Sequence, residues 1–285
     1  MDGDRLPPAA GPAAPGGVYL CRVGERLSCG ACCGLYNRTG VSRAALEELL
    51  GRRTERFRGT PRTAEAIDAY AREEERREPG RPRFAEVYRC PFLGFTGTGG
   101  GIPGCLLHPQ SEGNGGVDYR GLSFYGGLAC RDYFCPAHRM LKAPWKRILR
   151  AAAADWYAYG LLVTEHRLLR LFFAAGEDRL GRALEEEDEA AALPAFRAFA
   201  ALALDWPWRR PGHPGPGRDP FDDGTRRLPD DDPGSGGFSG SPFAPLFGEL
   251  GSRFASPGDR EAAERCLNEA LSRLAAAARR SFDAA

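Results

Sequence analysis

Nine cysteines are the residues of this 285-residue chain whose type and spacing indicate chemistry. Three of them lie together in the stretch Cys29-Gly30-Ala31-Cys32-Cys33. If this stretch forms a helical turn, positions i, i+3 and i+4 put the three thiols on one face. Gathered sulfur ligands favour a thiophilic metal such as zinc or iron. The predicted metal ligands are Cys29, Cys32, Cys33, Cys90, Cys105, Cys130 and Cys135.

The predicted ligands outnumber the four that one tetrahedral zinc ion uses. The surplus permits a four-cysteine iron–sulfur cluster, a site with spare redox thiols, or two metals. The C-x2-C-C run does not match the standard ferredoxin spacings, so spacing alone does not choose between zinc and an iron–sulfur cluster. Because Cys32 and Cys33 are adjacent, one can bind a metal while the other binds a second metal or stays free.

Four other residues are weaker candidates or have a simpler interpretation. Cys21 is a possible ligand, but it can also pack beneath the site. His108 and His138 each follow a cysteine by three positions, which is ligand-like spacing, but such histidines more often orient ligands or lie at the surface. Cys266 falls on the apolar stripe of the last predicted helix, which favours burial in the core.

Composition and charge are those of an ordinary globular protein, with 42% hydrophobic and 27% charged residues. The net charge of +1 gives no overall field that would attract nucleic acid or an anionic membrane. No stretch approaches the roughly 18 apolar residues of a membrane span, and the start resembles no signal peptide. We therefore expect a cytoplasmic protein with no nucleic-acid or membrane partner, and we leave a protein partner open. In a reducing compartment, cysteines serve as metal or redox groups more often than as disulfides.

Composition also divides the chain into five stretches. Residues 1–17 are rich in Pro, Gly and Ala and are expected to be a disordered tail. Residues 18–140 hold eight of the nine cysteines and form the predicted metal-binding domain. Residues 141–208 have helical periodicity. A Pro- and Gly-rich linker or loop is expected over 209–242, and a C-terminal helix over 243–285.

Within the cysteine-rich domain, residues 41–78 are predicted to be an insertion of two helices. Ser42 is placed to cap the first helix. Thr60 and Pro61 have the types preferred at the cap and first position of the second. The charged run 72–77 that ends the second helix is expected to face solvent.

The rest of that domain, residues 84–140, is predicted to be loops and short strands without a self-sufficient core. A glycine-rich segment over 97–101 is interpreted as a hairpin-like connection and not as a nucleotide-binding turn. The predicted fold is therefore mainly α: a cysteine-rich module of loops and short strands with a helical insertion, followed by a helical region.

The helical region is expected to begin at Pro144, placed as the first helical residue. Its pattern continues through 161–173, pauses at Gly176 and resumes over 180–192. A further helix is expected to begin at a cap on Ser256 and to end near residue 281.

Several cysteine motifs agree in order with those of one known family. They are Ser28-Cys29-Gly30-Ala31-Cys32-Cys33, Cys90-Pro91-Phe92-Leu93, Gly104-Cys105-Leu106-Leu107 with Pro109 close behind, and Cys130. Over residues 21–140 the chain thus resembles the zinc- or iron-chelating CxxCxxCC (YkgJ-like) family, which implies a short metal-chelating domain. Two features depart from the family pattern: Cys21 lies farther from the cysteine turn, and His108 stands where the family usually has tyrosine.

Longer members of that family resemble flagellin lysine N-methylase. This resemblance implies an alternative function, a cluster-dependent protein (lysine) N-methyltransferase that would use S-adenosylmethionine. No glycine-rich donor-binding βα unit of the usual kind is visible in the sequence. A thiol redox protein, in which spare cysteines cycle through disulfides, is a further alternative. The sequence assigns no catalytic residue and leaves enzymatic activity open.

Overall fold

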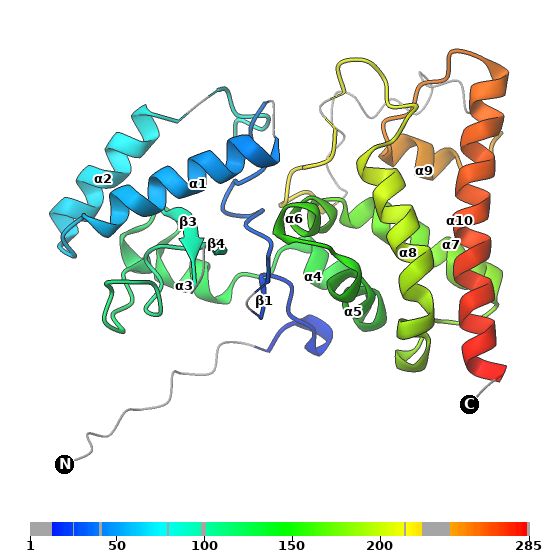
Figure 1. The fold of residues 1–285 in the computed structure, drawn as a ribbon, viewed down its shortest axis with the longest axis horizontal. Helices are drawn as coiled ribbons and strands as arrows, with labels where there is room; N and C mark the ends of the chain where they lie inside the picture. The colour runs from blue at the N-terminus through cyan, green and yellow to red at the C-terminus, as the bar shows by residue number, and fades with distance from the viewer. Residues whose placement is uncertain are drawn as a thin grey trace.

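The structure is a computed structural model, and it describes residues 13–24, 26–39, 42–78, 80–97, 101–213, 215–223 and 240–283. The chain is mainly helical, as its periodicity predicts (Figure 1). Its strands form two short antiparallel pairs. These are β1 (Arg22–Val23) with β2 (Leu27–Ser28), and β3 (Leu93–Thr96) with β4 (Ile102–Cys105).

Two helices, α1 (Arg43–Arg58) and α2 (Ala64–Arg76), occupy the predicted insertion, and α1 packs on β3 (Figure 1). Ser42 caps α1 as predicted, because its hydroxyl accepts a backbone N–H of the first turn. The second helix begins later than predicted, because Thr63 is the residue whose hydroxyl accepts a first-turn N–H. Thr60 instead donates its hydroxyl to a carbonyl in the last turn of α1.

The charged run 72–77 at the end of α2 does not face solvent throughout. Glu74 is fully buried, and its carboxylate lies 2.6 Å from Nε of Arg56 and 3.5 Å from Nε of Arg53. A buried carboxylate needs a cation beside it, and the neighbouring helix α1 supplies three, since Arg52 also pairs with Glu74 at 3.4 Å. The prediction of a solvated face is therefore wrong for Glu74.

Residues 84–140 contain the predicted hairpin and three helical turns that the sequence pattern did not indicate. The hairpin joins β3 to β4 with Leu93 opposite Cys105, and residues 98–100 at its tip lie outside the described part. The helical turns are η2 (Arg120–Leu122), α3 (Gly126–Asp132) and α4 (Pro136–Met140).

The helical region breaks at different residues from those predicted. Gly176 does not interrupt its helix; a Cβ at this position would meet the side chain of Leu274. The break comes at Gly181, whose φ of +84° is the left-handed conformation that ends many helices. The helices of this region are α5 (Ala143–Ala152), α6 (Trp156–Thr164), α7 (His166–Leu180), η3 (Glu186–Asp188) and α8 (Glu189–Leu204).

The C-terminal stretch 243–285 holds two helices where the sequence predicted one, α9 (Ala244–Glu249) and α10 (Pro257–Asp283). The predicted cap on Ser256 is confirmed, because its hydroxyl accepts the N–H of Asp259 at 3.1 Å. No helix in the described ranges has the length and the apolar character needed to cross a membrane.

Two stretches predicted as tail and linker are described only in part. Of the tail, residues 13–17 are described, and they include the 3-10 helix η1 (Pro15–Gly17), which contacts α4. Of residues 209–242, position 214 and positions 224–239 lie outside the described part. Within the described remainder, Arg218 is buried and its Nε lies 3.1 Å from the carboxylate of Glu165.

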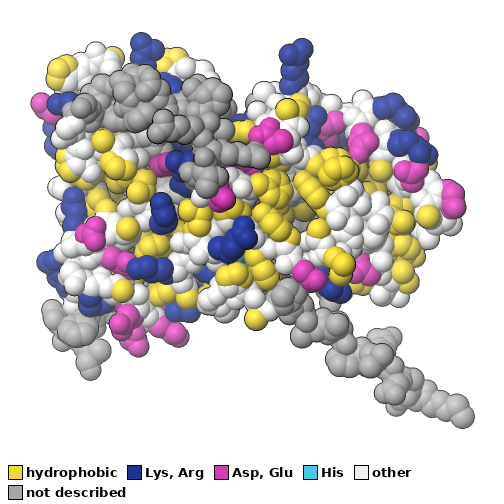
Figure 2. All heavy atoms as spheres, turned by 180° about the vertical axis from the view of Figure 1, so that it is seen from behind, with side chains coloured by type: hydrophobic (Ala, Val, Ile, Leu, Met, Phe, Trp, Pro, Cys, Tyr) yellow, Lys and Arg dark blue, Asp and Glu magenta, His cyan; other side chains and the backbone are white. Residues whose placement is uncertain are grey.

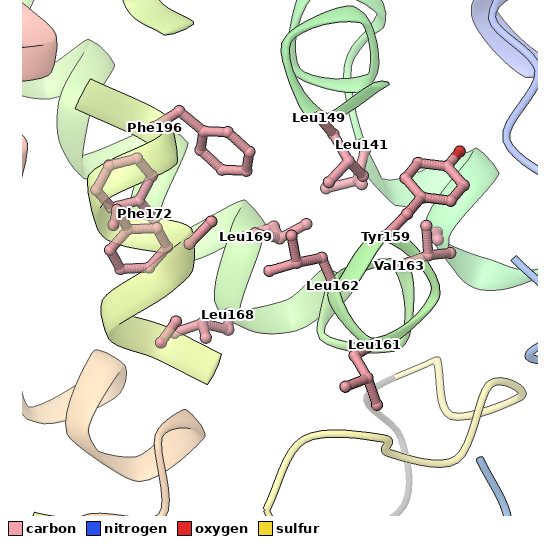
Figure 3. Packing of buried hydrophobic residues seen from close by; sticks show 14 of the residues in the cluster. Leu141, Leu149, Tyr159, Leu161, Leu162, Val163, Leu168, Leu169, Phe172 and Phe196 are labelled. Carbon is pink, nitrogen blue, oxygen red and sulfur yellow. The ribbon is translucent and has the colours of Figure 1, made fainter. Parts of the chain in front are cut away.

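One main hydrophobic core joins the cysteine-rich and helical regions. It contains Leu20 and Cys29 together with side chains of α5 to α8 and α10. Figure 3 shows Leu162 and Leu169 between Tyr159 and Phe172 in this core. A smaller core lies between α1, α2 and the β3–β4 hairpin. Its buried members are Phe57, Ile67, Tyr70, Cys90, Phe92, Leu106 and Leu107.

The surface carries both signs of charge. Figure 2 shows acidic and basic side chains interspersed over one face of the molecule. This distribution agrees with the net charge of +1 and gives that face no broad patch of a single sign.

Candidate metal centre

The first cysteines lie on the β1–β2 hairpin and on the turns that follow it. Arg22 pairs with Ser28, and the N–H of Cys29 donates to the carbonyl of Cys21 at 2.9 Å. Cys21 and Cys29 therefore face each other across the open end of the hairpin. Gly30, with φ of +64°, turns the chain directly after Cys29. The stretch 29–33 does not form the helical turn considered from the sequence, because Gly30 has a left-handed conformation and residues 31–36 form non-helical turns.

His138 connects Cys135 to this hairpin. The Sγ of Cys135 lies 3.4 Å from Nδ1 of His138, and the N–H of Leu20 donates to Nε2 of the same ring at 2.9 Å. Because Nε2 accepts, the proton of the neutral imidazole resides on Nδ1, next to the sulfur. Burial, with a smaller contribution from the charge of nearby Lys146, lowers the pKa of His138 to about 4, so the neutral ring is the form present at pH 7. His138 thus fixes Cys135 beside the residue that precedes Cys21.

A second set of backbone contacts joins Cys33 to the β3–β4 hairpin. The N–H of Cys90 donates to the carbonyl of Cys33 at 3.0 Å. Cys90 lies just before β3, and Cys105 is the last residue of β4, opposite Leu93. The two ends of this hairpin therefore bring Cys90 and Cys105 toward Cys33.

Cys130 lies in α3 and is exposed, with its Sγ 3.4 Å from the hydroxyl of Ser123. The chain before α3 is fixed to the end of the β3–β4 hairpin, because the N–H of Tyr119 donates to the carbonyl of Leu107 at 3.0 Å. It is also fixed to the residues before Cys90, because the rings of Phe124 and Tyr88 lie 4.6 Å apart between centroids. Cys130 is therefore held on the same side of the molecule as Cys90 and Cys105.

The thiols near the β1–β2 hairpin influence one another's ionisation. Burial raises the pKa of Cys21, and the charges of Cys32 and Cys135 raise it further. Burial also raises the pKa of Cys29, and the charges of Cys135 and Cys32 raise it further. The pKa of Cys135 rises to about 11, first from burial and then from Cys32. Without a cation these thiols resist ionisation, and a bound cation would reverse that preference.

The remaining thiols form a corresponding set. The pKa of Cys33 is raised most by its hydrogen bond with Cys32, then by burial, and further by the charges of Cys32, Cys90 and Cys105. Burial raises the pKa of Cys90, and Cys105 and Cys130 add to it. Burial also raises the pKa of Cys105 to about 11, and Cys130 contributes. The hydrogen bond from Cys33 lowers the pKa of Cys32, so Cys32 loses its proton more readily than Cys33.

Sequence reasoning missed two buried basic residues near the thiols. Arg53 is 0% exposed, and its guanidinium donates to the carbonyl of Cys90 at 2.9 Å and lowers the pKa of that thiol. Lys146 donates to the carbonyl of His138 at 3.0 Å; burial lowers the pKa of this lysine, and the charge of Cys135 partly offsets that shift. The signal for Arg53 was its position on the apolar face of a predicted helix, where a charged residue needs a partner.

The structure thus places the seven predicted ligands and Cys21 in one region. His138 joins them beside Cys135, whereas the Nδ1 of His108 accepts the N–H of Gln110 and its charged neighbours are Arg120, Asp118 and Arg22. Among the residues that the structure describes, no three Cys, His, Asp or Glu side chains stand where they could hold a metal ion as they are. No family model, curated protein or solved structure matches this chain.

Proposed function

We propose that this chain is a metal-binding protein that holds zinc or an iron–sulfur cluster through cysteine thiolates. The observation that supports the proposal best is the approach of eight cysteines from distant segments to one region, through the backbone and side-chain contacts described above. Thiolate is the preferred ligand of both metals. The proposed ligands are Cys21, Cys29, Cys32, Cys33, Cys90, Cys105, Cys130 and Cys135.

The donor set fits a metal better than it fits a group of free thiols. Burial, together with the charges of neighbouring thiols, raises the pKa values of six of them, and a bound cation would replace the protons and offset the charge. Because no three of the described side chains stand where they could hold a metal ion as they are, binding includes rotation of the thiols about their Cα–Cβ bonds. Zinc would fasten the short strands and loops together, and an iron–sulfur cluster would add electron transfer.

The resemblance to the CxxCxxCC (YkgJ-like) family supports the same function and favours a cysteine-rich metal-binding module at residues 18–140. All nine cysteines are free thiols in the structure. Free thiols in this number are typical of a reducing compartment, so we place the protein in the cytoplasm as part of the proposal.

The test is metal analysis of the anaerobically purified chain together with its optical spectrum and its acid-labile sulfide. A colourless protein with stoichiometric zinc, or a brown protein with iron, sulfide and broad sulfur-to-iron absorption, would support the proposal. A metal-free protein with eight or more reactive thiols would contradict it. Cys266→Ser is the matched control, because Cys266 lies on α10 and is not a proposed ligand.

One observation favours a second candidate function, thiol redox chemistry. Cys32 and Cys33 are adjacent and hydrogen-bonded, and the lowered pKa of Cys32 favours its nucleophilic thiolate form. Counting thiols after mild oxidation while following metal content would separate reversible disulfide formation from a purely structural site. The methyltransferase alternative stays a prediction from the family resemblance, and transfer of label from S-adenosylmethionine to protein in a lysate would test it.

A further inference from the structure

We infer that the eight thiols form two separate metal centres side by side, each with its own four cysteines. The inference rests on the proposed function and specifies the number of centres and their ligands. It also explains why two adjacent cysteines are present in the turn, since each would serve a different centre. The first centre uses Cys21, Cys29, Cys32 and Cys135, and the second uses Cys33, Cys90, Cys105 and Cys130.

The first centre is built on the β1–β2 hairpin and α4. Its frame is the hydrogen bond between the backbones of Cys29 and Cys21 and the imidazole that joins Cys135 to Leu20. Cys29 and Cys135 are both buried in the main hydrophobic core. Cys32 is assigned here because it lies in the same turn as Cys29, and because the other thiol of that turn, Cys33, is joined through its carbonyl to Cys90.

The second centre is built on the β3–β4 hairpin and α3. Its frame is the hydrogen bond from Cys90 to the carbonyl of Cys33 and the strand register that brings Cys105 to the same end of the hairpin. Cys90 is buried in the smaller core, and Cys105 packs against that core. Cys130 belongs here because the chain that leads into α3 is fixed beside Cys105 by the hydrogen bond from Tyr119 to Leu107, and beside Cys90 by the ring contact between Phe124 and Tyr88.

The division falls between Cys32 and Cys33. Cys33 packs against both hydrophobic cores. Cys29 is buried in the main core, and Cys90 is buried in the smaller core. A single tetrahedral ion uses four sulfurs at about 2.3 Å and would leave the other four thiols, most of them buried or half-buried, without a cation. In two-cluster ferredoxins, neighbouring cysteines of one run also bind different clusters.

Each set of thiols has its own buried, positively charged side chain nearby. Lys146 donates to the carbonyl of His138, whose ring contacts Cys135, and Arg53 donates to the carbonyl of Cys90. A divalent ion with four thiolates carries a net charge of 2−, so two adjacent centres need separate positive neighbours. Lys146 supplies a positive charge next to the first centre, and Arg53 supplies one next to the second.

The direct experiment compares metal per chain in the wild type, Cys135→Ser, Cys90→Ser, the double variant and Cys266→Ser, all purified anaerobically. We expect each single variant to hold half of the wild-type metal, the double variant to hold none, and Cys266→Ser to hold the full amount. If either single variant loses all metal or retains all of it, the two-centre inference is wrong. A wild type without metal contradicts the proposed function itself, so the two failures are distinguishable.

A cobalt titration of the metal-free wild-type chain gives a second test that needs no variant to fold. We expect sulfur-to-cobalt absorption to rise until two equivalents of Co²⁺ have been added. A plateau at one equivalent would leave the proposed function intact and overturn the second centre. Circular dichroism of each variant monitors folding, and where a variant does not fold the wild-type titration decides.

Discussion

The backbone N–H of Cys90 donates to the backbone carbonyl of Cys33 at 3.0 Å. Cys33 ends the cysteine turn, and Cys90 precedes the β3–β4 hairpin, with the whole helical insertion between them in sequence. This contact therefore brings together two thiols of the proposed second centre that lie far apart in sequence. It also makes the position of the insertion relevant to the metal, because α1 packs on β3 and contributes Arg53.

The first prediction concerns Gly160, where α6 lies against the cysteine turn. A Cβ at this position would come within 2.6 Å of the carbonyl oxygen of Cys29 and would overlap the hydroxyl of Tyr36. We expect Gly160→Ala to reduce the free energy of unfolding by about 1–3 kcal/mol and to reduce metal retention, because the backbone of the turn must shift. Urea unfolding and metal analysis measure the two effects.

Gly248→Ala in α9 is the matched control, because a Cβ there meets no atom within 4 Å. We expect this variant to unfold at the same or a higher urea concentration than the wild type. Equal stability of the two variants would contradict the close packing of α6 on the cysteine turn.

The second prediction concerns Arg53, which lies fully buried between the thiols and the acidic side chains of the insertion. Its guanidinium pairs with Glu78 and Glu74 and donates to the carbonyl of Cys90. Arg53→Ala leaves buried carboxylates without this partner, so we expect a loss of about 3–5 kcal/mol in the free energy of unfolding. Arg58→Ala, which removes two exposed ion pairs, should cost less than about 1 kcal/mol. Denaturant unfolding of both variants gives the comparison. Similar losses of unfolding free energy would show that the buried ion-pair network adds nothing to stability.

The third prediction separates the roles of the two histidines in the cysteine-rich region. Because His138 orients Cys135 and is not a proposed ligand, His138→Ala should weaken metal binding at the first centre by about 10–100-fold and leave the second unchanged. His108→Ala should leave both centres unchanged, because its ring accepts from Gln110 and touches no proposed ligand among the contacts described. Competition with a chelator measures both affinities, and complete loss of one metal in His108→Ala would make that histidine a ligand.

The fourth prediction is a loss of stability at acidic pH that depends on His213. Burial, with a contribution from Arg218, lowers the pKa of His213 from 6.5 to about 4 in the folded chain. Protonation therefore favours the unfolded chain, so this part of the stability is complete above pH 6.5 and declines as the pH falls toward 4. Allowing for the partial exposure of the ring, the loss is about 1 kcal/mol.

The measurement is the thermal midpoint of the wild type and of His213→Gln at pH 7 and pH 5, at equal metal loading. We expect the wild type to lose more stability than the variant over this interval. The variant removes only part of the effect, because burial also lowers the pKa values of His138 and His166. Identical losses in the two proteins would show that His213 does not titrate in this way.

The sequence predicted the features that depend on neighbouring residues. Ser42 and Ser256 cap helices as expected, because a side-chain oxygen satisfies a first-turn N–H within three residues. The glycine-rich connection joins an antiparallel hairpin as expected. The sequence interpretation of Gly176 and Glu74 was wrong. The environment of each residue is set by a helix that packs against it in space, which local sequence patterns do not reveal.

The candidate site could be predicted in composition but not in arrangement. Cysteine count and spacing indicated the thiols, but the hydrogen bond from Leu20 to His138 joins residues 118 positions apart. The sequence likewise held no sign that Cys33 contacts both hydrophobic cores. Such relationships come from tertiary packing, which single-chain periodicity does not encode.

X-ray absorption at the metal edge of the purified wild-type chain tests the central claim most directly, because it reports the atoms bound to the metal. We expect a first shell made only of sulfur, with four sulfurs at about 2.3 Å if the metal is zinc. A first shell dominated by nitrogen or oxygen would contradict the account, because the metal would then be held by residues other than the clustered cysteines.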